Sequence, residues 1–124
     1  RLRVALPPLL DRTRLQQAAD YHGVHIDFVS TPEEAVEGVD FVFAGCRGGL
    51  DDETQEQWRI SEALMSRAAP NAHLLLGSTP MHTVQVDRSV LCSPASLLLL
   101  QAENRLRVHK RVLHWLFNEN EREI

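Results

Sequence analysis

The residues best suited to chemistry lie in two glycine-containing loops, Gly45–Gly49 and Gly77–His82. Each loop follows an apolar run that predicts a strand, Val39–Ala44 before the first loop and His73–Leu76 before the second. In an open parallel sheet, ligands bind beyond the carboxyl ends of the strands. Glycine lets the backbone approach a ligand closely, and neighbouring polar residues can fix the ligand's orientation. We therefore expect a small-molecule site that draws on these two loops.

Individual side chains in the loops leave alternatives open. Arg47 suits an anion, but its position in a loop fits a solvent-exposed arginine equally well. Cys46 is better explained as a half-buried thiol than as a nucleophile, because no histidine lies near it in the sequence. His82 either acts as an acid or base or lies on the surface. The loop Gly45–Gly49 does not fit G-x-G-x-x-G, which argues against a dinucleotide site.

The elements that must position these loops alternate between strands and helices. Short apolar or β-branched runs predict strands, and amphipathic spacing with capping residues predicts helices. The expected strands are Arg1–Leu6, Val24–Val29, Val39–Ala44 and His73–Leu76, and the expected helices are Asp11–His22, a short helix after Ser30 that ends at Gly38, Asp51–Ala69 and Ala102–Asn118. Met81–Cys92 has no clear period and is expected to be a loop. Such alternation predicts βαβ units around a parallel sheet.

Local signals add detail to three of these elements. Ser30 is expected to cap the short helix, and Glu33 to complete a capping box. The pair Asp51 and Asp52 is better explained as an acidic helix start than as a metal site. Val39–Ala44, interrupted only by Asp40, is expected to be a buried parallel strand.

The bulk composition narrows the class of protein. The 124 residues fit one domain, expected over 1–118 with the final helix included, followed by an acidic tail at 119–124. A net charge of -4 gives no basic surface for nucleic acid, and apolar runs such as Leu97–Leu100 are too short to cross a membrane. Two distant cysteines without a C-x-x-C pattern are typical of a reduced, cytoplasmic protein, and no cofactor or metal is indicated. The start at Arg1, without methionine, is typical of a fragment or processed product.

Five segments, taken in order, resemble one enzyme family. They are Arg1–Pro8, Ser30–Ala44, Gly77–Pro80, Gln85–Pro94 and Gln101–Arg105. The last of them, Q-A-E-N-R, is similar to the sequence that opens the final helix of ornithine carbamoyltransferases. The chain therefore resembles the C-terminal, amino-acid-binding domain of the ornithine/aspartate carbamoyltransferase family, and it is closer to the ornithine branch.

The resemblance implies a three-layer, Rossmann-like α/β fold with about five parallel strands flanked by helices. It implies that the amino group of an acceptor attacks the carbonyl carbon of carbamoyl phosphate, without a metal or covalent intermediate in most members. Arg105 matches the arginine that contacts carbamoyl phosphate, and Thr79 matches a residue whose carbonyl meets the carbamoyl nitrogen. Pro80 matches a proline after a cis peptide, so we expect a cis Thr79–Pro80 bond.

Departures from the family pattern bear on the acceptor. Gly77 and Ser78 replace the histidine and cysteine of the ornithine branch, and Gly45 falls where an acceptor-binding aspartate belongs. Arg47 lies close to the place of an arginine that binds a carboxylate in the aspartate branch. These changes indicate an amine or amino-acid acceptor other than standard ornithine. A catalytically lost binding or regulatory module is the alternative, and the same replacements favour it.

The resemblance also implies a missing half. No S-T-R-T/S phosphate loop occurs in the chain, and that loop belongs to the family's N-terminal, carbamoyl-phosphate-binding domain. We expect this chain to be inactive alone, and the resemblance implies a homotrimer for the full enzyme. Apolar residues on more than one face of the last helix are expected to face the missing domain, namely Leu106, Val112, Leu113, Leu116 and Phe117.

Overall fold

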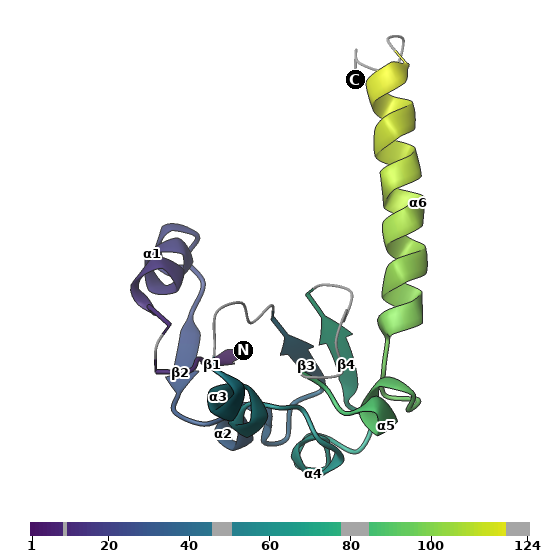
Figure 1. Ribbon diagram of the computed structural model, residues 1–124. Coiled ribbons are helices and arrows are strands. Elements are labelled where there is room, and N and C mark those ends of the chain that lie inside the picture. The colour runs from purple at the N-terminus through teal and green to yellow at the C-terminus, as the bar shows by residue number, and fades with distance from the viewer. Residues whose placement is uncertain (9, 46–50, 78–84, 119–124) are drawn as a thin grey trace.

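The strands of this protein, seen in a computed structural model, run parallel and form two pairs (Figure 1). The structure describes residues 1–8, 10–45, 51–77 and 85–118. In these residues β1 (Leu2–Ala5) pairs with β2 (Ile26–Val29), and β3 (Phe41–Ala44) pairs with β4 (His73–Leu76). The α/β class with parallel strands is confirmed. The described residues form four strands where about five were expected, because the segment after β4 contributes only a single parallel bridge, Leu74 to Ser96.

Six helices connect and follow these strands in the described part of the chain. They are α1 (Thr13–Tyr21), α2 (Pro32–Val36), α3 (Asp52–Gln57), α4 (Glu62–Met65), α5 (Arg88–Leu91) and α6 (Leu98–Phe117). Helix α1 confirms the expected helix after Asp11, and α5 lies inside the segment that was expected to be a loop. Helix α6 begins before the expected Ala102, so its first turn includes the apolar Leu98.

The helix expected over Asp51–Ala69 is wrong as a single element, because it is divided into α3 and α4. At the break, the Ile60 amide donates to the Gln85 carbonyl at 2.9 Å, and the Asp87 amide donates to the Ile60 carbonyl at 2.9 Å. This parallel bridge pulls the backbone out of helical geometry. Ser61 then starts α4, since its hydroxyl accepts from the Leu64 amide at 3.2 Å.

The capping box of α2 lies one residue later than expected. Thr31, not Ser30, is the N-cap, and its hydroxyl accepts from the Glu34 amide at 3.2 Å. The Glu34 carboxylate in turn accepts from the Ser30 amide at 3.0 Å. Both hydroxyl residues can cap, and with Thr31 as cap Pro32 is the first residue of the helix. The helix ends before Gly38, whose positive φ of 64° suits glycine.

The core lies on one face of the β3–β4 pair. Leu74 of β4 is completely buried, and residues of α2, α4, α5 and the bridge at Ile60 pack against the same face. The opposite face carries Phe41 and Phe43, which are 60% and 64% exposed. The expectation that this strand is buried throughout is therefore wrong, because only the alternate side chains Val42 and Ala44 reach the core.

Helix α6 leaves the body of the protein after its first turns (Figure 1). It contacts β4, and Leu98 packs against the core, yet no residue of the helix is buried. The apolar side chains expected to face a missing domain are all exposed, as is Trp115, whereas Trp58 is buried. No helix in the described residues is long and apolar enough to cross a membrane.

Candidate functional site

The two loops that were predicted to meet begin side by side at the carboxyl ends of β3 and β4. The Gly77 amide donates to the Ala44 carbonyl at 2.8 Å, which extends the β3–β4 pairing by one residue. A Cβ placed on Gly77 would lie 3.6 Å from the Cα of Gly45. The structure thus brings together the first residues of both candidate loops, as expected for neighbouring parallel strands.

The space above Gly77 is occupied by an aromatic side chain. A Cβ on Gly77 would lie 3.1 Å from Cζ of Phe43 and 3.4 Å from the Ala44 carbonyl oxygen. The first distance is shorter than an ordinary van der Waals contact, so a larger residue at position 77 requires the Phe43 ring to move. Glycine at this position is therefore matched to Phe43, a partner that sequence reasoning did not find because the contact joins two strands.

A glutamine side chain connects α6 to the same strand end. The Leu76 amide donates to Oε1 of Gln101 at 3.0 Å, and Nε2 of Gln101 donates to the Leu76 carbonyl at 3.2 Å. Gln101 is half-buried, and Leu76 immediately precedes Gly77. Gln101, the first residue of Q-A-E-N-R, therefore contacts the strand end at the candidate site. No role for Gln101 beyond its place in that motif could be predicted from the sequence.

Arg105 lies one helical turn after Gln101, on the same face of α6. Its side chain is exposed and makes no ion pair with any residue in the described ranges. The neighbouring Arg107 instead pairs with Glu103. A guanidinium without a carboxylate partner keeps all its donors for an anion, which suits the role that the sequence suggested for Arg105.

Six of the predicted site residues lie outside the residues that the structure describes. They belong to the two loops and are Cys46, Arg47, Ser78, Thr79, Pro80 and His82. The expected cis bond between Thr79 and Pro80 also lies outside the described residues. Of the candidate set, Gly45 and Gly77 are therefore placed together, and Arg105 is placed on the helix that Gln101 ties to them.

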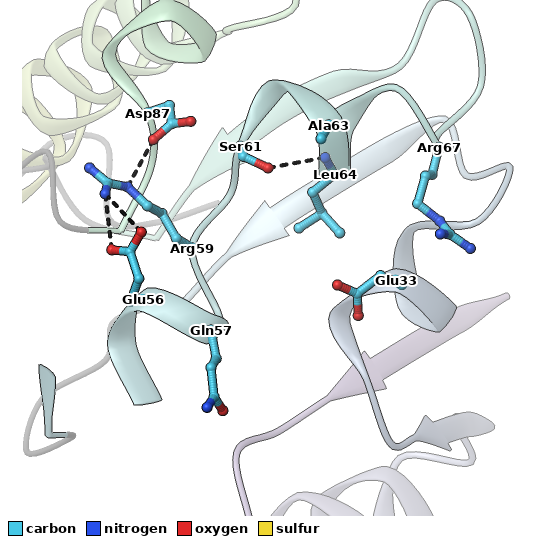
Figure 2. Close-up of a pocket in the computed structure, with 9 residues that line it drawn as sticks. All are labelled: Glu33, Glu56, Gln57, Arg59, Ser61, Ala63, Leu64, Arg67 and Asp87. Atoms are coloured by element: carbon cyan, nitrogen blue, oxygen red, sulfur yellow. Dashed lines mark hydrogen bonds and ion pairs between the residues drawn. The ribbon is translucent and has the colours of Figure 1, made fainter. Parts of the chain in front are cut away.

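A separate cavity of about 400 Å³ lies between α2, α3, α4 and the segment before α5 (Figure 2). Arg59 reaches between two carboxylates there, with Nε 2.8 Å from Asp87 and Nη1 3.0 Å from Glu56. Arg67, on the other side, pairs with Glu37 at 3.0 Å. Both arginines already have carboxylate partners. We therefore regard the ion pairs around this cavity as structural, since they hold the segment around Asp87 in place.

The acidic start of α3 behaves as a helix cap. The Asp51 carboxylate accepts from the Thr54 amide at 2.8 Å and from the Thr54 hydroxyl at 3.1 Å. These hydrogen bonds hold the pKa of Asp51 below its ordinary value of 3.8, since they favour the ionised form. The described residues contain no group of three or more His, Cys, Asp or Glu side chains that could hold a metal.

Comparison with known proteins gives consistent relatives. Residues 2–116 match the family described as aspartate/ornithine carbamoyltransferase, Asp/Orn binding domain. The ornithine carbamoyltransferase of Methanothermobacter thermautotrophicus is 30% identical over an alignment of 129 positions, gaps included, which covers 94% of this chain and 43% of that protein. The ornithine carbamoyltransferase of Rhodopseudomonas palustris is 32% identical over an alignment of 125 positions, gaps included, which covers 94% of this chain and 40% of that protein. The chain thus spans about two fifths of the length of these relatives.

Solved structures share the fold. Ornithine carbamoyltransferase from Thermus thermophilus superposes with a TM-score of 0.74 at 23% identity, covering 94% of this chain and 39% of that one. Acetylornithine transcarbamylase complexed with acetylcitrulline gives a TM-score of 0.72 at 23% identity, covering 95% and 41%. Ornithine carbamoyltransferase from Gloeobacter violaceus gives a TM-score of 0.65 at 27% identity, covering 86% of this chain and 37% of that one. The expected fold is confirmed by these similarities.

Proposed function

Because the chain belongs to the aspartate/ornithine carbamoyltransferase family as its Asp/Orn-binding domain, we propose that it forms the acceptor-binding half of a carbamoyltransferase. The reaction is transfer of the carbamoyl group from carbamoyl phosphate to an amine or amino acid other than standard ornithine. The amino nitrogen attacks the carbonyl carbon, the C–O bond to phosphate breaks, and the nitrogen gives up a proton. No metal or cofactor has a role in this proposal.

One observation carries the proposal: the carboxyl ends of β3 and β4 meet at Gly45 and Gly77, and Gln101 ties the Arg105 helix to that point. Carbamoyl transfer depends mainly on holding two reactants in line and on stabilising charge that develops on oxygen. Arg105 is the donor proposed for that charge, since a guanidinium offers several N–H groups in a fixed fork. The loop residues Ser78, Thr79 and Pro80 are proposed to complete the contacts with the carbamoyl group.

The acceptor is proposed to differ from ornithine because two positions lack side chains. Gly45 offers no carboxylate to an acceptor's amino group, and Gly77 offers no imidazole. Phe43 fills the space beside Gly77 with an exposed aromatic ring. Cys46, Arg47 and His82 are the loop side chains proposed to contact the acceptor, with Arg47 suited to a carboxylate.

The rest of the carbamoyl phosphate site is proposed to come from an N-terminal domain. The chain matches only 43% and 40% of its relatives' lengths and contains no S-T-R-T/S phosphate loop. The exposed apolar residues of α6 are a suitable surface for that domain. We propose that the chain is inactive alone and that the full enzyme acts in the cytoplasm as a homotrimer.

The test is formation of a ureido product from carbamoyl phosphate by the full-length protein. The acceptor panel contains ornithine, aspartate, their N-acylated forms and simple diamines. Product with at least one acceptor other than ornithine is expected. Exclusive use of ornithine would contradict the acceptor proposal. No product from a folded protein with an intact phosphate loop would contradict the transferase proposal.

Arg105→Ala provides the site-specific arm of the same experiment. Loss of a charged donor in a closed site is expected to cost several kcal/mol of transition-state stabilisation, on the order of 2–4 kcal/mol. Arg107→Ala is the matched control, because Arg107 lies on the same helix but already pairs with Glu103. Equal kinetics in Arg105→Ala and the parent enzyme would remove Arg105 from the proposed site.

A second candidate function is a binding or regulatory module that has lost catalysis. The bare positions Gly45 and Gly77 favour it, since both replacements delete family side chains. It predicts saturable binding of carbamoyl phosphate or an amino acid to the full-length protein without any ureido product. Calorimetry beside the product assay separates the two functions, because the transferase must show both binding and turnover.

A further inference from the structure

Gln101 replaces a strand residue beside β4. Two residues before Leu76, the Leu74 amide donates to the Ala95 carbonyl at 2.8 Å, and the Leu97 amide donates to the Leu74 carbonyl at 3.0 Å. A continuing parallel strand would offer the Leu97 carbonyl to the Leu76 amide. That carbonyl instead accepts from the Gln101 amide at 2.8 Å, because α6 begins there. The backbone of this segment therefore does not form the next pair of parallel-sheet hydrogen bonds, those to Leu76.

The Gln101 side chain supplies that pair of hydrogen bonds. Its amide group carries the same donor and acceptor as a peptide group, and it bonds both the N–H and the C=O of Leu76, at 3.0 Å and 3.2 Å. Leu76 is buried, so its backbone groups need partners. Only glutamine and asparagine carry a side-chain amide with both an N–H and a C=O, and asparagine is one methylene shorter.

The two bonds also fix α6 about its own axis. No residue of α6 is buried, so core packing alone holds the helix weakly beyond Leu98. A two-point bond at Gln101 defines which face of the helix turns to β4. Arg105 is four residues later and shares that face, about 6 Å further along the axis. Because Cα–Cβ bonds tilt toward the helix N-terminus, the Arg105 side chain starts back toward the end of β4.

We propose that Gln101 is a positioning residue, which sets the orientation of α6 and thereby holds Arg105 at the carboxyl ends of β3 and β4. The consequence for carbamoyl phosphate rests on the function proposed above. The tether itself does not, since it concerns Gln101 and Leu76 alone. Misplacement of a binding group by about 1 Å is enough to cost on the order of 100-fold in activity.

The test uses the full-length protein with Gln101→Met, which keeps the length and helix propensity of the side chain but removes both bonds. Carbamoyl phosphate affinity, measured by calorimetry, is expected to fall about 10- to 100-fold. The double variant Gln101→Met/Arg105→Ala is expected to bind within about threefold of Arg105→Ala alone, because Gln101 acts through Arg105. Gln16→Met is the matched control, because the side-chain amide of this α1 glutamine donates to exposed Asp20 and the variant should leave affinity unchanged.

Amide hydrogen exchange tests the tether without any ligand. Exchange at Leu76 is expected to quicken about 10-fold in Gln101→Met, whereas the Gly77 amide, bonded to Ala44, keeps its protection. If Gln101→Met does not fold, Gln101→Glu serves instead, because it can accept from the Leu76 amide but cannot donate to the carbonyl when ionised.

The outcomes separate the two proposals. Parent-like affinity in Gln101→Met, or losses that add in the double variant, would overturn the positioning role. A parent protein that binds no carbamoyl phosphate would contradict the proposed function instead. In that event the exchange data decide the tether, and unchanged protection of Leu76 would overturn it.

Discussion

Truncation of Leu74 to alanine should destabilise this chain by about 3 kcal/mol. Leu74 has no exposed surface, and its backbone is bonded toward Ala95–Leu97 on the side away from β3. Leucine-to-alanine changes at buried positions cost about 2–5 kcal/mol, from lost transfer energy and from the cavity left behind. Because β4 is held by β3 on one edge and by the segment Ala95–Leu97 on the other, the surroundings of Leu74 cannot collapse fully, which excludes the lowest part of that range.

Leu75→Ala is the matched control, because Leu75 is the next residue of β4 and points to the opposite face. Loss of a partly exposed leucine that pairs with Phe43 across the two strands should cost about 1 kcal/mol or less. Urea denaturation followed by far-ultraviolet circular dichroism gives both values, and the m-value should be the same in both variants. Equal losses in the two variants would refute the one-sided core, since they would require the Phe43 face to be covered as well.

Three further predictions concern the cap, the glycine and the last helix. Hydrogen bonds from Thr54 lower the pKa of Asp51, so the stability that the carboxylate contributes is complete above pH 3.8 and is lost as the pH falls through the pKa of the folded state. Asp51→Asn should therefore make the fall in stability at acid pH less steep. An unchanged fall in this variant would contradict the cap. Gly77→Ala should cost about 1 kcal/mol, and less in a Phe43→Ala background, whereas equal costs in a double-mutant cycle would exclude the contact. This chain should bind a hydrophobic dye or self-associate, and Leu113→Gln should reduce either signal; a dye-silent monomer would contradict an exposed apolar face.

The strands were predictable because their signals are local. Each is a short run rich in apolar residues and bounded by residues that break regular structure, and Gly23 and Gly38 do adopt the positive φ angles that end the preceding helices. Parallel pairing followed from the alternation of helices and strands. The same rule predicts that the loops beginning at Gly45 and Gly77 lie together, since carboxyl ends of neighbouring parallel strands share one edge.

The errors arose where contacts between distant segments override local preference. The sequence from Asp51 to Ala69 has helical character throughout, but the pairing of Ile60 with Val86 divides it. The exposure of Phe43 could not be inferred from an apolar run, because composition does not tell which face of a strand is covered. The tether from Gln101 to Leu76 spans 25 residues and leaves no periodic signal. A motif drew attention to Gln101, but only the backbone of β4 explains it.

The pattern of α6 connects the proposed site with the proposed missing domain. Gln101, Arg105, Val108 and Val112 are spaced by four, three and four residues, so they share one face of the helix. Only the first of these reaches β4, and the exposed valines continue that face beyond the sheet. A domain that covers the valines would also remove water from around Arg105, which lies between them and Gln101. Since a guanidinium attracts an anion more strongly when water is excluded, the proposed assembly of the two halves would strengthen the site at the same step that completes it.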